Sequence, residues 1–245
     1  MKVNFIICGA QKSGTTALDS YLRQHTDICM APRKEVHFFD REENFLDNTL
    51  DYSAYHSVFN LEPSHRLLGE STPIYMYWYD APKRIWQYNS DIKLIVLLRN
   101  PIERAYSSWN MLLSEKRESL SFWEAIQTES ERCREALPYQ HRLYSYIDRG
   151  FYLEQLRRLW RFFPREQVLV LKSEELRENS TEIMQKVFDF LGVEALAKMN
   201  FENKHSTPYD SKMTKREKDY LIDIFEYEIK ALERVLGWDC SDWLL

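Results

Sequence analysis

The sequence predicts an α/β fold in which a central parallel β-sheet is flanked by helices. Three observations support this prediction. Short apolar runs alternate with helical patterns along the chain. The run at 92–98 is almost continuously aliphatic, as expected for a strand buried on both faces of a parallel sheet. A glycine-containing turn also joins the first apolar run to a helical pattern, as in a strand that leads into a crossover helix.

The individual elements follow from local patterns. We expect strands at 3–8, 27–31, 67–70, 92–98 and 167–172, and helices near 14–24, 101–116, 121–135, 152–163, 180–191 and 214–236. Ser121 with Glu124 and Thr214 with Glu217 are spaced as capping boxes, which open helices. Asn100 can cap the helix that begins at the following proline. In the last helix, apolar residues recur on one face, which we expect to pack in the core.

The turn after the first strand is built to hold phosphate. Gly9 and Gly14 let the main chain approach an anion, and the N-terminus of the next helix presents unpaired N–H groups and partial positive charge. A Walker A loop has lysine directly after its second glycine. Here Thr15 fills that position and Lys12 lies two residues before Gly14. The fold is therefore predicted to be P-loop NTPase-like, but with a ligand whose reacting centre lies elsewhere along its phosphate chain. The alternative is a turn without a ligand.

A second anion-binding position is expected after the strand at 92–98. A P-loop NTPase often places an aspartate for Mg²⁺ at this point, whereas Arg99 follows here. Ser107 would lie roughly 10 Å along the next helix at about 1.5 Å per residue. Together, Arg99 and Ser107 could bind one terminal phosphate monoester, which takes several charged hydrogen bonds.

Three ordered motifs resemble those of sulfotransferases that use 3′-phosphoadenosine 5′-phosphosulfate (PAPS). They lie at 11–16, 34–40 and 98–107. The chain is most similar to the branch of heparan sulfate glucosaminyl sulfotransferases and their bacterial relatives. Further matches at 149–152, 161–164 and 236–238 extend the resemblance over nearly the whole chain. The resemblance implies a single sulfotransferase domain over residues 1–245, with PAPS as co-substrate, 3′-phosphoadenosine 5′-phosphate (PAP) as product, and no required metal.

The resemblance also implies roles for the matched residues. The donor would be bound by Lys12, Ser13, Gly14, Thr15 and Thr16 at its 5′ end, by Arg99 and Ser107 at its 3′-phosphate, and by Arg149, Tyr152 and Lys204 around the nucleotide. Lys12 would also be catalytic, because charge accumulates on the bridging oxygen as the phosphate end departs. Lys204 belongs to a polar segment at 203–209, where the family places a closing loop.

Glu35 is implied as the general base that removes the acceptor proton, and His37 is the second candidate. On an extended segment these two side chains would face the same side, since side chains alternate with period two. Without the flanking motifs, the segment would be interpreted as a mixed-charge surface loop. The expected reaction is an in-line transfer of a sulfuryl group to a hydroxyl or amine of a small-molecule, lipid or carbohydrate acceptor.

One position departs from the pattern of the heparan branch. Ser71 stands where those enzymes commonly have a lysine, in Glu70-Ser71-Thr72-Pro73. One fewer cation makes a carbohydrate polyanion less favourable, so a neutral or small acceptor is at least as well supported. The aromatic cluster at 75–79 either lines an acceptor pocket or packs at the sheet edge.

Composition limits the other possibilities. A chain of 245 residues with 44% hydrophobic content fits one compact domain. The net charge of −5 predicts no general attraction to nucleic acid or to an anionic membrane. The four cysteines show no C-x-x-C spacing, so neither a disulfide framework nor a zinc site is expected. With no apolar run of roughly 18 residues and no signal peptide, we expect a cytoplasmic protein without a membrane span.

Two other function classes compete with the transferase. A P-loop nucleotide or small-molecule kinase would need Mg²⁺ and a lysine after Gly14, where Thr15 stands. A non-catalytic nucleotide-binding module would keep Lys12 and Arg99 but would need no base.

Overall fold

The computed structural model describes residues 2–46, 50–201 and 211–245. Contacts within the chain divide it into two compact units. Unit 1 comprises residues 1–98 and 158–205, and unit 2 comprises residues 99–157 and 206–245. The expected single domain stays a prediction.

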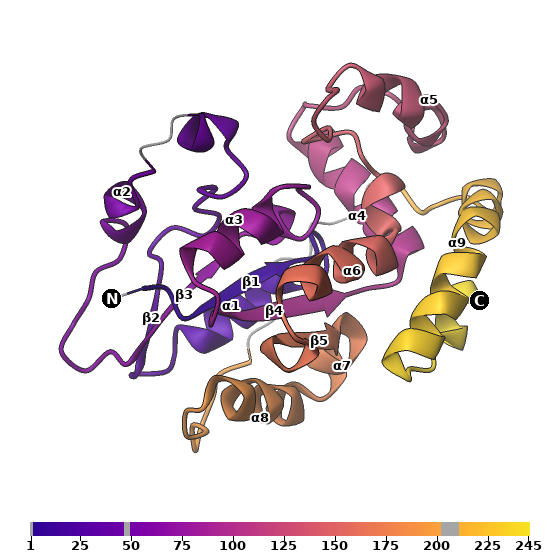
Figure 1. The fold of residues 1–245 in the computed structure, drawn as a ribbon. Helices are drawn as coiled ribbons and strands as arrows, with labels where there is room; N and C mark the ends of the chain where they lie inside the picture. The colour runs from indigo at the N-terminus through magenta and orange to yellow at the C-terminus, as the bar shows by residue number, and fades with distance from the viewer. Residues whose placement is uncertain (1, 47–49, 202–210) are drawn as a thin grey trace. The chain divides into compact units, whose positions relative to one another are not determined.

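Unit 1 is built on a five-stranded parallel sheet with the strand order β2-β3-β1-β4-β5 (Figure 1). The strands are β1 (Phe5–Gly9), β2 (Ile28–Met30), β3 (Leu67–Ser71), β4 (Lys93–Leu98) and β5 (Val168–Lys172). Each expected strand is confirmed, with small differences at its ends. Every neighbouring pair in the sheet is parallel, so the carboxyl ends of all five strands lie at one edge.

Helices of unit 1 cover the sheet. They are α1 (Thr15–Leu22), α2 (Ser53–His56), α3 (Ala81–Tyr88), α7 (Ser173–Glu178), α8 (Ser180–Leu191) and the second part of α6 (Tyr152–Phe162). The sequence analysis did not predict α2, α3 or α7. The signal for α3 was present, since Pro82 lies in its first turn, a position that proline favours.

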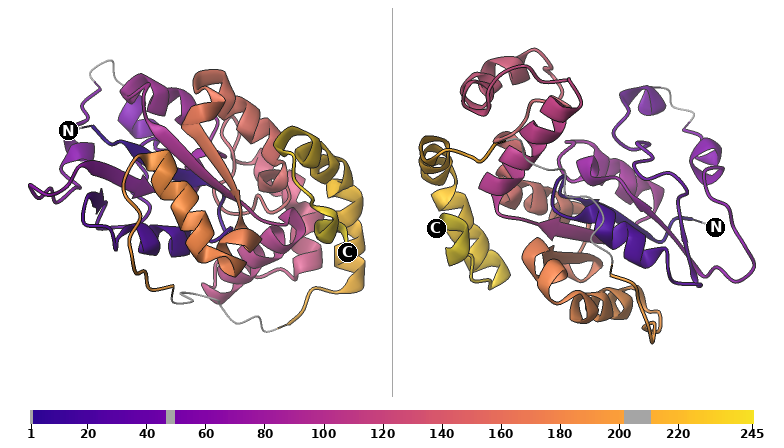
Figure 2. Two further views of the ribbon diagram at one scale, coloured as in Figure 1. Left: turned by 90° about the horizontal axis from the view of Figure 1, so that it is seen from below. Right: turned by 180° about the vertical axis from the view of Figure 1, so that it is seen from behind.

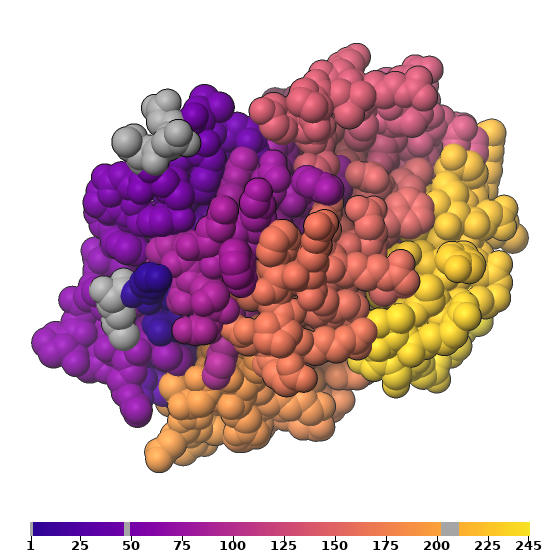
Figure 3. Space-filling model, in the orientation of Figure 1, coloured from indigo at the N-terminus to yellow at the C-terminus, as the bar shows by residue number. Residues whose placement is uncertain are grey.

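A hydrophobic core lies between the sheet and the helices α1, α7 and α8. Alternate residues of β1, such as Phe5 and Ile7, face this core together with Leu18 of α1 and Phe188 of α8. Figure 2 shows these helices beside the sheet in two further views. The opposite side of α8 carries exposed residues, Glu182, Gln185 and Lys186, and Figure 3 shows this orange helix at the surface. This two-sided pattern explains why the sequence predicted α8 well.

The second face of the sheet packs against aromatic residues. Phe38, Phe39, Tyr55, Tyr75 and Tyr88 make a continuous set of ring contacts, with centroids 4.8 to 5.6 Å apart. In the cluster at 75–79, the rings of Tyr75, Tyr77 and Trp78 are buried and the ring of Tyr79 is exposed. Packing at the sheet therefore accounts for most of that cluster.

Unit 2 contains α4 (Pro101–Ser114), α5 (Phe122–Arg134), the start of α6 and α9 (Lys215–Leu236). Within this unit, α4 packs against both α5 and α9. The predicted caps are confirmed: Asn100 Oδ1 accepts the Ile102 N–H at 2.9 Å, and capping boxes open α5 and α9. In the described part of the chain, no helix combines the length and apolar character needed to cross a bilayer.

Gly69 of β3 lies opposite Phe5 of β1. A Cβ atom at Gly69 would lie 2.1 Å from Phe5 Cζ, and that ring is completely buried. We expect Gly69→Ala to lower the free energy of unfolding by about 1–3 kcal/mol through overpacking, as measured by chemical denaturation. The control is a double-mutant cycle with Phe5→Leu. The double variant should lose less free energy of unfolding than the two single variants lose together. Strict additivity would contradict this explanation.

Candidate functional site

The predicted glycine turn links β1 to α1, and its binding of phosphate stays a prediction. Gly14 is the N-cap of α1 and has a φ of 89°. Because glycine has no side chain, its position gives the helix start no side-chain cap. The Ser13 side chain is fully buried, and its Oγ has no hydrogen-bond partner within the described residues. Thr15 is buried and Thr16 is half-buried. An uncapped helix start beside an unsatisfied buried hydroxyl fits an anionic phosphate group.

The segment that carries Glu35 and His37 leaves the sheet beside this turn. The Glu35 N–H donates to the Ser71 carbonyl at 2.8 Å, and Ser71 is the last residue of β3, which pairs with β1. Because β1 and β3 are parallel neighbours, the Glu35 segment and the phosphate-binding turn both lie at the carboxyl edge of the sheet, the usual ligand-binding edge of such sheets.

Glu35, His37 and Asp40 form a connected series of polar side chains. The distance from His37 Nε2 to Glu35 Oε2 is 3.3 Å, and the distance from His37 Nδ1 to Asp40 Oδ2 is 3.0 Å. Asp40 is fully buried, whereas 39% of the Glu35 side chain is exposed. Lys34 Nζ lies 3.1 Å from Glu35 Oε1. The series therefore runs from a buried carboxylate through an imidazole to an accessible carboxylate.

The segment is not extended at Glu35 and His37. Glu35 has a φ of 63° and His37 a φ of 56°, both in the left-handed region. The physical reason is that the backbone follows hydrogen bonds to β3 and to the turn after it instead of pairing as a strand. The expectation that both side chains lie in one place is nevertheless confirmed by the 3.3 Å contact.

The electrostatics assign different protonation states to the two groups. Burial opposes ionisation of Glu35, but hydrogen bonds from His37 and Lys34 and their positive charges outweigh it and lower its pKa to about 2. Hydrogen bonds to Asp40 and Glu35 raise the pKa of His37 to about 9. Near neutral pH, Glu35 is therefore a carboxylate and His37 an imidazolium. Of these two groups, only the carboxylate can accept a proton.

Arg99 and Ser107 belong to unit 2. Arg99 directly follows β4, and its guanidinium pairs with Glu103, with an Nη2 to Oε2 distance of 2.7 Å. Ser107 is buried on α4, two turns further along that helix. Their shared binding of a 3′-phosphate stays a prediction.

Arg149 and Tyr152 are buried in unit 2 and make structural contacts there. The Arg149 guanidinium donates to Ser145 Oγ at 2.8 Å and to the Arg142 carbonyl at 2.6 Å. The Tyr152 hydroxyl donates to the Arg99 carbonyl at 2.9 Å. These residues therefore order the backbone around Arg99 and residues 142–145, and their contact with a nucleotide stays a prediction. Lys204 lies outside the described residues.

Sequence reasoning gave no role to two buried carboxylates beside the Glu35 segment, Asp40 and Glu70. Both are fully buried. Glu70 offered a signal, because it is a charged residue inside a run that otherwise reads as a buried strand, and such groups rarely occur unpaired. Among the described residues, no group of three or more His, Cys, Asp or Glu side chains is placed to hold a metal ion.

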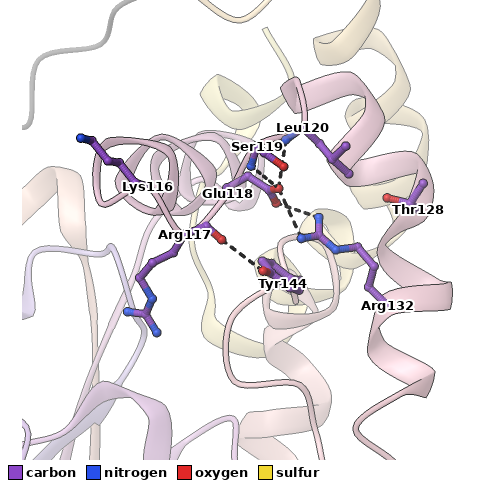
Figure 4. A pocket seen from close by; sticks show the side chains of 8 residues that line it. All are labelled: Lys116, Arg117, Glu118, Ser119, Leu120, Thr128, Arg132 and Tyr144. Atoms are coloured by element: carbon purple, nitrogen blue, oxygen red, sulfur yellow. Dashed lines mark hydrogen bonds and ion pairs between the residues drawn. The ribbon is translucent and has the colours of Figure 1, made fainter.

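A separate pocket of about 460 Å³ lies in unit 2 and contains none of the predicted site residues (Figure 4). Glu118 lines it, and its carboxylate accepts from Arg132 at 2.7 Å, from the Tyr146 hydroxyl at 2.6 Å and from the next two backbone N–H groups. This carboxylate is therefore already occupied by hydrogen bonds within the protein. Glu118 therefore joins the loop after α4 to α5 and to the segment around Tyr146.

A parallel sheet whose first strand leads through a glycine turn into a helix defines an α/β protein of the P-loop class. The model of the sulfotransferase domain family matches residues 2–226. The chain belongs to the sulfotransferase family. The resemblance, fold class and enzyme class predicted from the motifs are thus confirmed.

Individual relatives agree with this assignment. The human heparan sulfate glucosamine 3-O-sulfotransferase 3B1 is 32% identical over 78% of this chain and 46% of its own length. The membrane-associated sulfotransferase kil1 of Dictyostelium discoideum is 23% identical over 96% of this chain and 65% of its own length. The chain thus spans less than two thirds of both curated relatives. A crystal structure of a sulfotransferase from Alicyclobacillus acidocaldarius has a TM-score of 0.87 and 30% identity, covering 99% of both chains.

Proposed function

We propose that this protein transfers a sulfuryl group from PAPS to a hydroxyl or amine of an acceptor, with Glu35 as general base. The observation that carries the proposal is the ionised, accessible Glu35 carboxylate, supported by His37 and Asp40 at the carboxyl edge of the sheet. A phosphate-binding turn at the same edge is the second part of the argument.

The residues of the turn would hold the 5′ end of the donor. When bound, PAPS supplies the sulfuryl group and leaves as PAP. The N–H groups at the start of α1 and the unsatisfied Ser13 hydroxyl fit the 5′-phosphate. Lys12 would neutralise charge that develops on the bridging oxygen. Arg99 and Ser107 are the residues of unit 2 proposed for the 3′-phosphate.

Glu35 would take the proton of the acceptor as its oxygen or nitrogen attacks sulfur. The imidazolium of His37 cannot serve as that base, and we propose that it orients the Glu35 carboxylate while Asp40 fixes the ring. A carboxylate held this way needs little reorganisation when the acceptor arrives.

The acceptor is proposed to present a hydroxyl and to be neutral or small. The 3-O-sulfotransferase relatives are named for heparan sulfate glucosamine, which supports an oxygen as the accepting atom. The position that carries a lysine in that branch is Ser71 here, and it is buried. A polyanion therefore has one cation fewer to bind. A screen of phenols, saccharides and lipids with labelled PAPS tests the acceptor class.

Isothermal titration calorimetry with PAP and with ATP, each with and without Mg²⁺, tests the donor. We expect PAP to bind more tightly than ATP and independently of the metal, because the proposed contacts recognise a 3′-phosphate through protein groups alone. A preference for ATP with Mg²⁺ would favour the kinase alternative. Tight PAP binding without turnover on any acceptor would favour a non-catalytic module.

Arg99→Ala is expected to weaken PAP binding roughly ten- to hundred-fold, because hydrogen bonds to a charged group contribute about 1.5–3 kcal/mol. The same calorimetric titration measures the loss. Adenosine 5′-phosphosulfate, which lacks the 3′-phosphate, is the matched control and should bind both forms of the protein alike. Unchanged PAP affinity would remove Arg99 from the 3′-phosphate site.

A further inference from the structure

Glu70 is a buried charge that the proposed mechanism does not yet use. It is fully buried at the carboxyl end of β3. The Tyr55 hydroxyl donates to its Oε1 at 2.6 Å, and the Thr72 hydroxyl donates to its Oε2 at 2.7 Å. Glu70 therefore acts as a common acceptor for two surrounding hydroxyls.

The hydroxyls of Thr72 and Tyr75 bind the backbone on either side of His37. The Val36 N–H donates to Thr72 Oγ1 at 3.0 Å, and the Phe38 N–H donates to the Tyr75 hydroxyl at 2.8 Å. Glu35 and His37 have left-handed backbone angles, which are unfavourable for residues with a side chain. Contacts from outside the segment must therefore hold it in this conformation.

The direction of each hydroxyl hydrogen connects these two observations. A hydroxyl has one hydrogen to donate and two lone pairs to accept with. Because Thr72 gives its hydrogen to Glu70, its lone pairs are available to the Val36 N–H of the segment. A neutral amide or a protonated carboxyl in place of the carboxylate must donate a hydrogen itself, and a surrounding hydroxyl must then turn away from its present partner.

We propose that Glu70 is a positioning residue for the reaction: its carboxylate orients the Thr72 hydroxyl, which binds the backbone between Glu35 and His37 and holds both residues in the reactive conformation. The inference rests on the proposed function, in which Glu35 is the base. It extends the series of polar groups from the accessible carboxylate to a second buried one.

The titration of Glu70 provides a readout for this role. Burial raises the pKa of Glu70 to about 7, although its hydroxyl partners oppose the shift. The other ionisable groups around it are Asp40, Tyr55 of α2, Tyr75 after β3, Cys8 of β1 and Tyr88 of α3. The pKa values of the thiol and the three phenols are raised further above neutral. Positioning should therefore be complete above pH 7 and be lost as the pH falls through this value.

The test compares wild type with Glu70→Gln, Thr72→Val and the matched control Tyr55→Phe. Tyr55→Phe removes a hydrogen bond to the same carboxylate but leaves the Thr72 link in place. Glu70→Gln and Thr72→Val should lower kcat roughly 10- to 100-fold, as expected for a displacement of the base on the order of 1 Å. PAP affinity should stay near wild type in all three variants. The Tyr55 hydrogen bond lowers the pKa of Glu70, so Tyr55→Phe should move the acidic limb to higher pH but keep a kcat near wild type at a pH high enough to ionise Glu70. The acidic limb near pH 7 should disappear in Glu70→Gln.

NMR titration of the His37 ring supplies a readout that does not depend on activity. Its raised pKa reports the contacts with Asp40 and Glu35, so we expect the pKa to fall toward its ordinary value in Glu70→Gln and Thr72→Val but not in Tyr55→Phe. If wild type is inactive while His37 responds in this way, the positioning role stands and the proposed function fails. The inference would be overturned if Glu70→Gln kept the wild-type kcat and an unchanged His37 titration. If Glu70→Gln does not fold, the same result in Thr72→Val would overturn it. Equal losses in Tyr55→Phe at a pH that keeps Glu70 ionised would do so too, because they would indicate a purely structural role.

Discussion

Glu35→Gln is expected to lower kcat by about 10²–10⁴, the range that a general base contributes, while PAP affinity stays nearly unchanged. Glutamine keeps the size of the side chain but cannot take the acceptor proton. It also removes a negative charge beside the imidazolium, so the pKa of His37 should fall while Asp40, its stronger partner, keeps part of the elevation. Steady-state kinetics with labelled donor and a calorimetric titration with PAP measure the two quantities separately.

A neighbouring substitution controls for general effects of removing a carboxylate. Glu43→Gln changes an exposed side chain in the short helical turn after the motif and should retain wild-type turnover. Because the pKa of Glu35 is about 2, its ionisation cannot produce an activity change near neutral pH. Full turnover in Glu35→Gln would exclude this residue as the base and direct attention to His37, whose deprotonated form exists mainly above about pH 9.

Lys12→Ala is expected to lower kcat by about 10²–10³, the usual loss when a donor to developing charge is removed. PAP affinity should fall much less, since the backbone N–H groups of the turn and the residues proposed for the 3′-phosphate remain. An interaction made mainly in the transition state lowers kcat and kcat/KM together. Single-turnover kinetics at saturating donor isolate this step from donor binding.

The backbone at Lys12 determines the matched control. Its φ is 68°, so a glycine substitution would relieve strain as well as remove the ammonium group. Alanine retains a Cβ atom and avoids this second effect. Lys12→Arg, which keeps the charge, should recover part of the lost turnover. A variant Lys12→Ala that bound PAP poorly but turned over at the wild-type rate would show that the lysine anchors the donor without acting on the bridging oxygen.

Local sequence patterns predicted much of the fold because they depend on residues close together in the chain. The continuous aliphatic run of β4 requires burial on both faces, and the capping boxes of α5 and α9 satisfy the first N–H groups of their own helices. Helix α2 escaped prediction because four residues are too few to show a helical period.

The candidate site was predicted in part for the same reason. The glycine turn from β1 to α1 is a local feature, and its residues lie where the motif indicated. Arg149 illustrates the limit: its guanidinium binds backbone carbonyls of its own unit, which its motif did not predict, and its contact with a nucleotide stays a prediction. The sequence of a motif does not show which partner a charged side chain contacts.

The amino-acid sequence by itself determined the parallel α/β arrangement, the glycine turn between β1 and α1, and the family to which this protein belongs. Only the tertiary structure decided the conformation of Glu35 and His37 and the hydrogen-bond partners of Glu70. Val36 and Thr72 are 36 residues apart in the chain, and they meet because β3 pairs with both β1 and β2 and ends beside the segment that follows β2. The protonation states of the buried carboxylates depend on burial and on partners that this pairing creates, and a linear pattern contains neither.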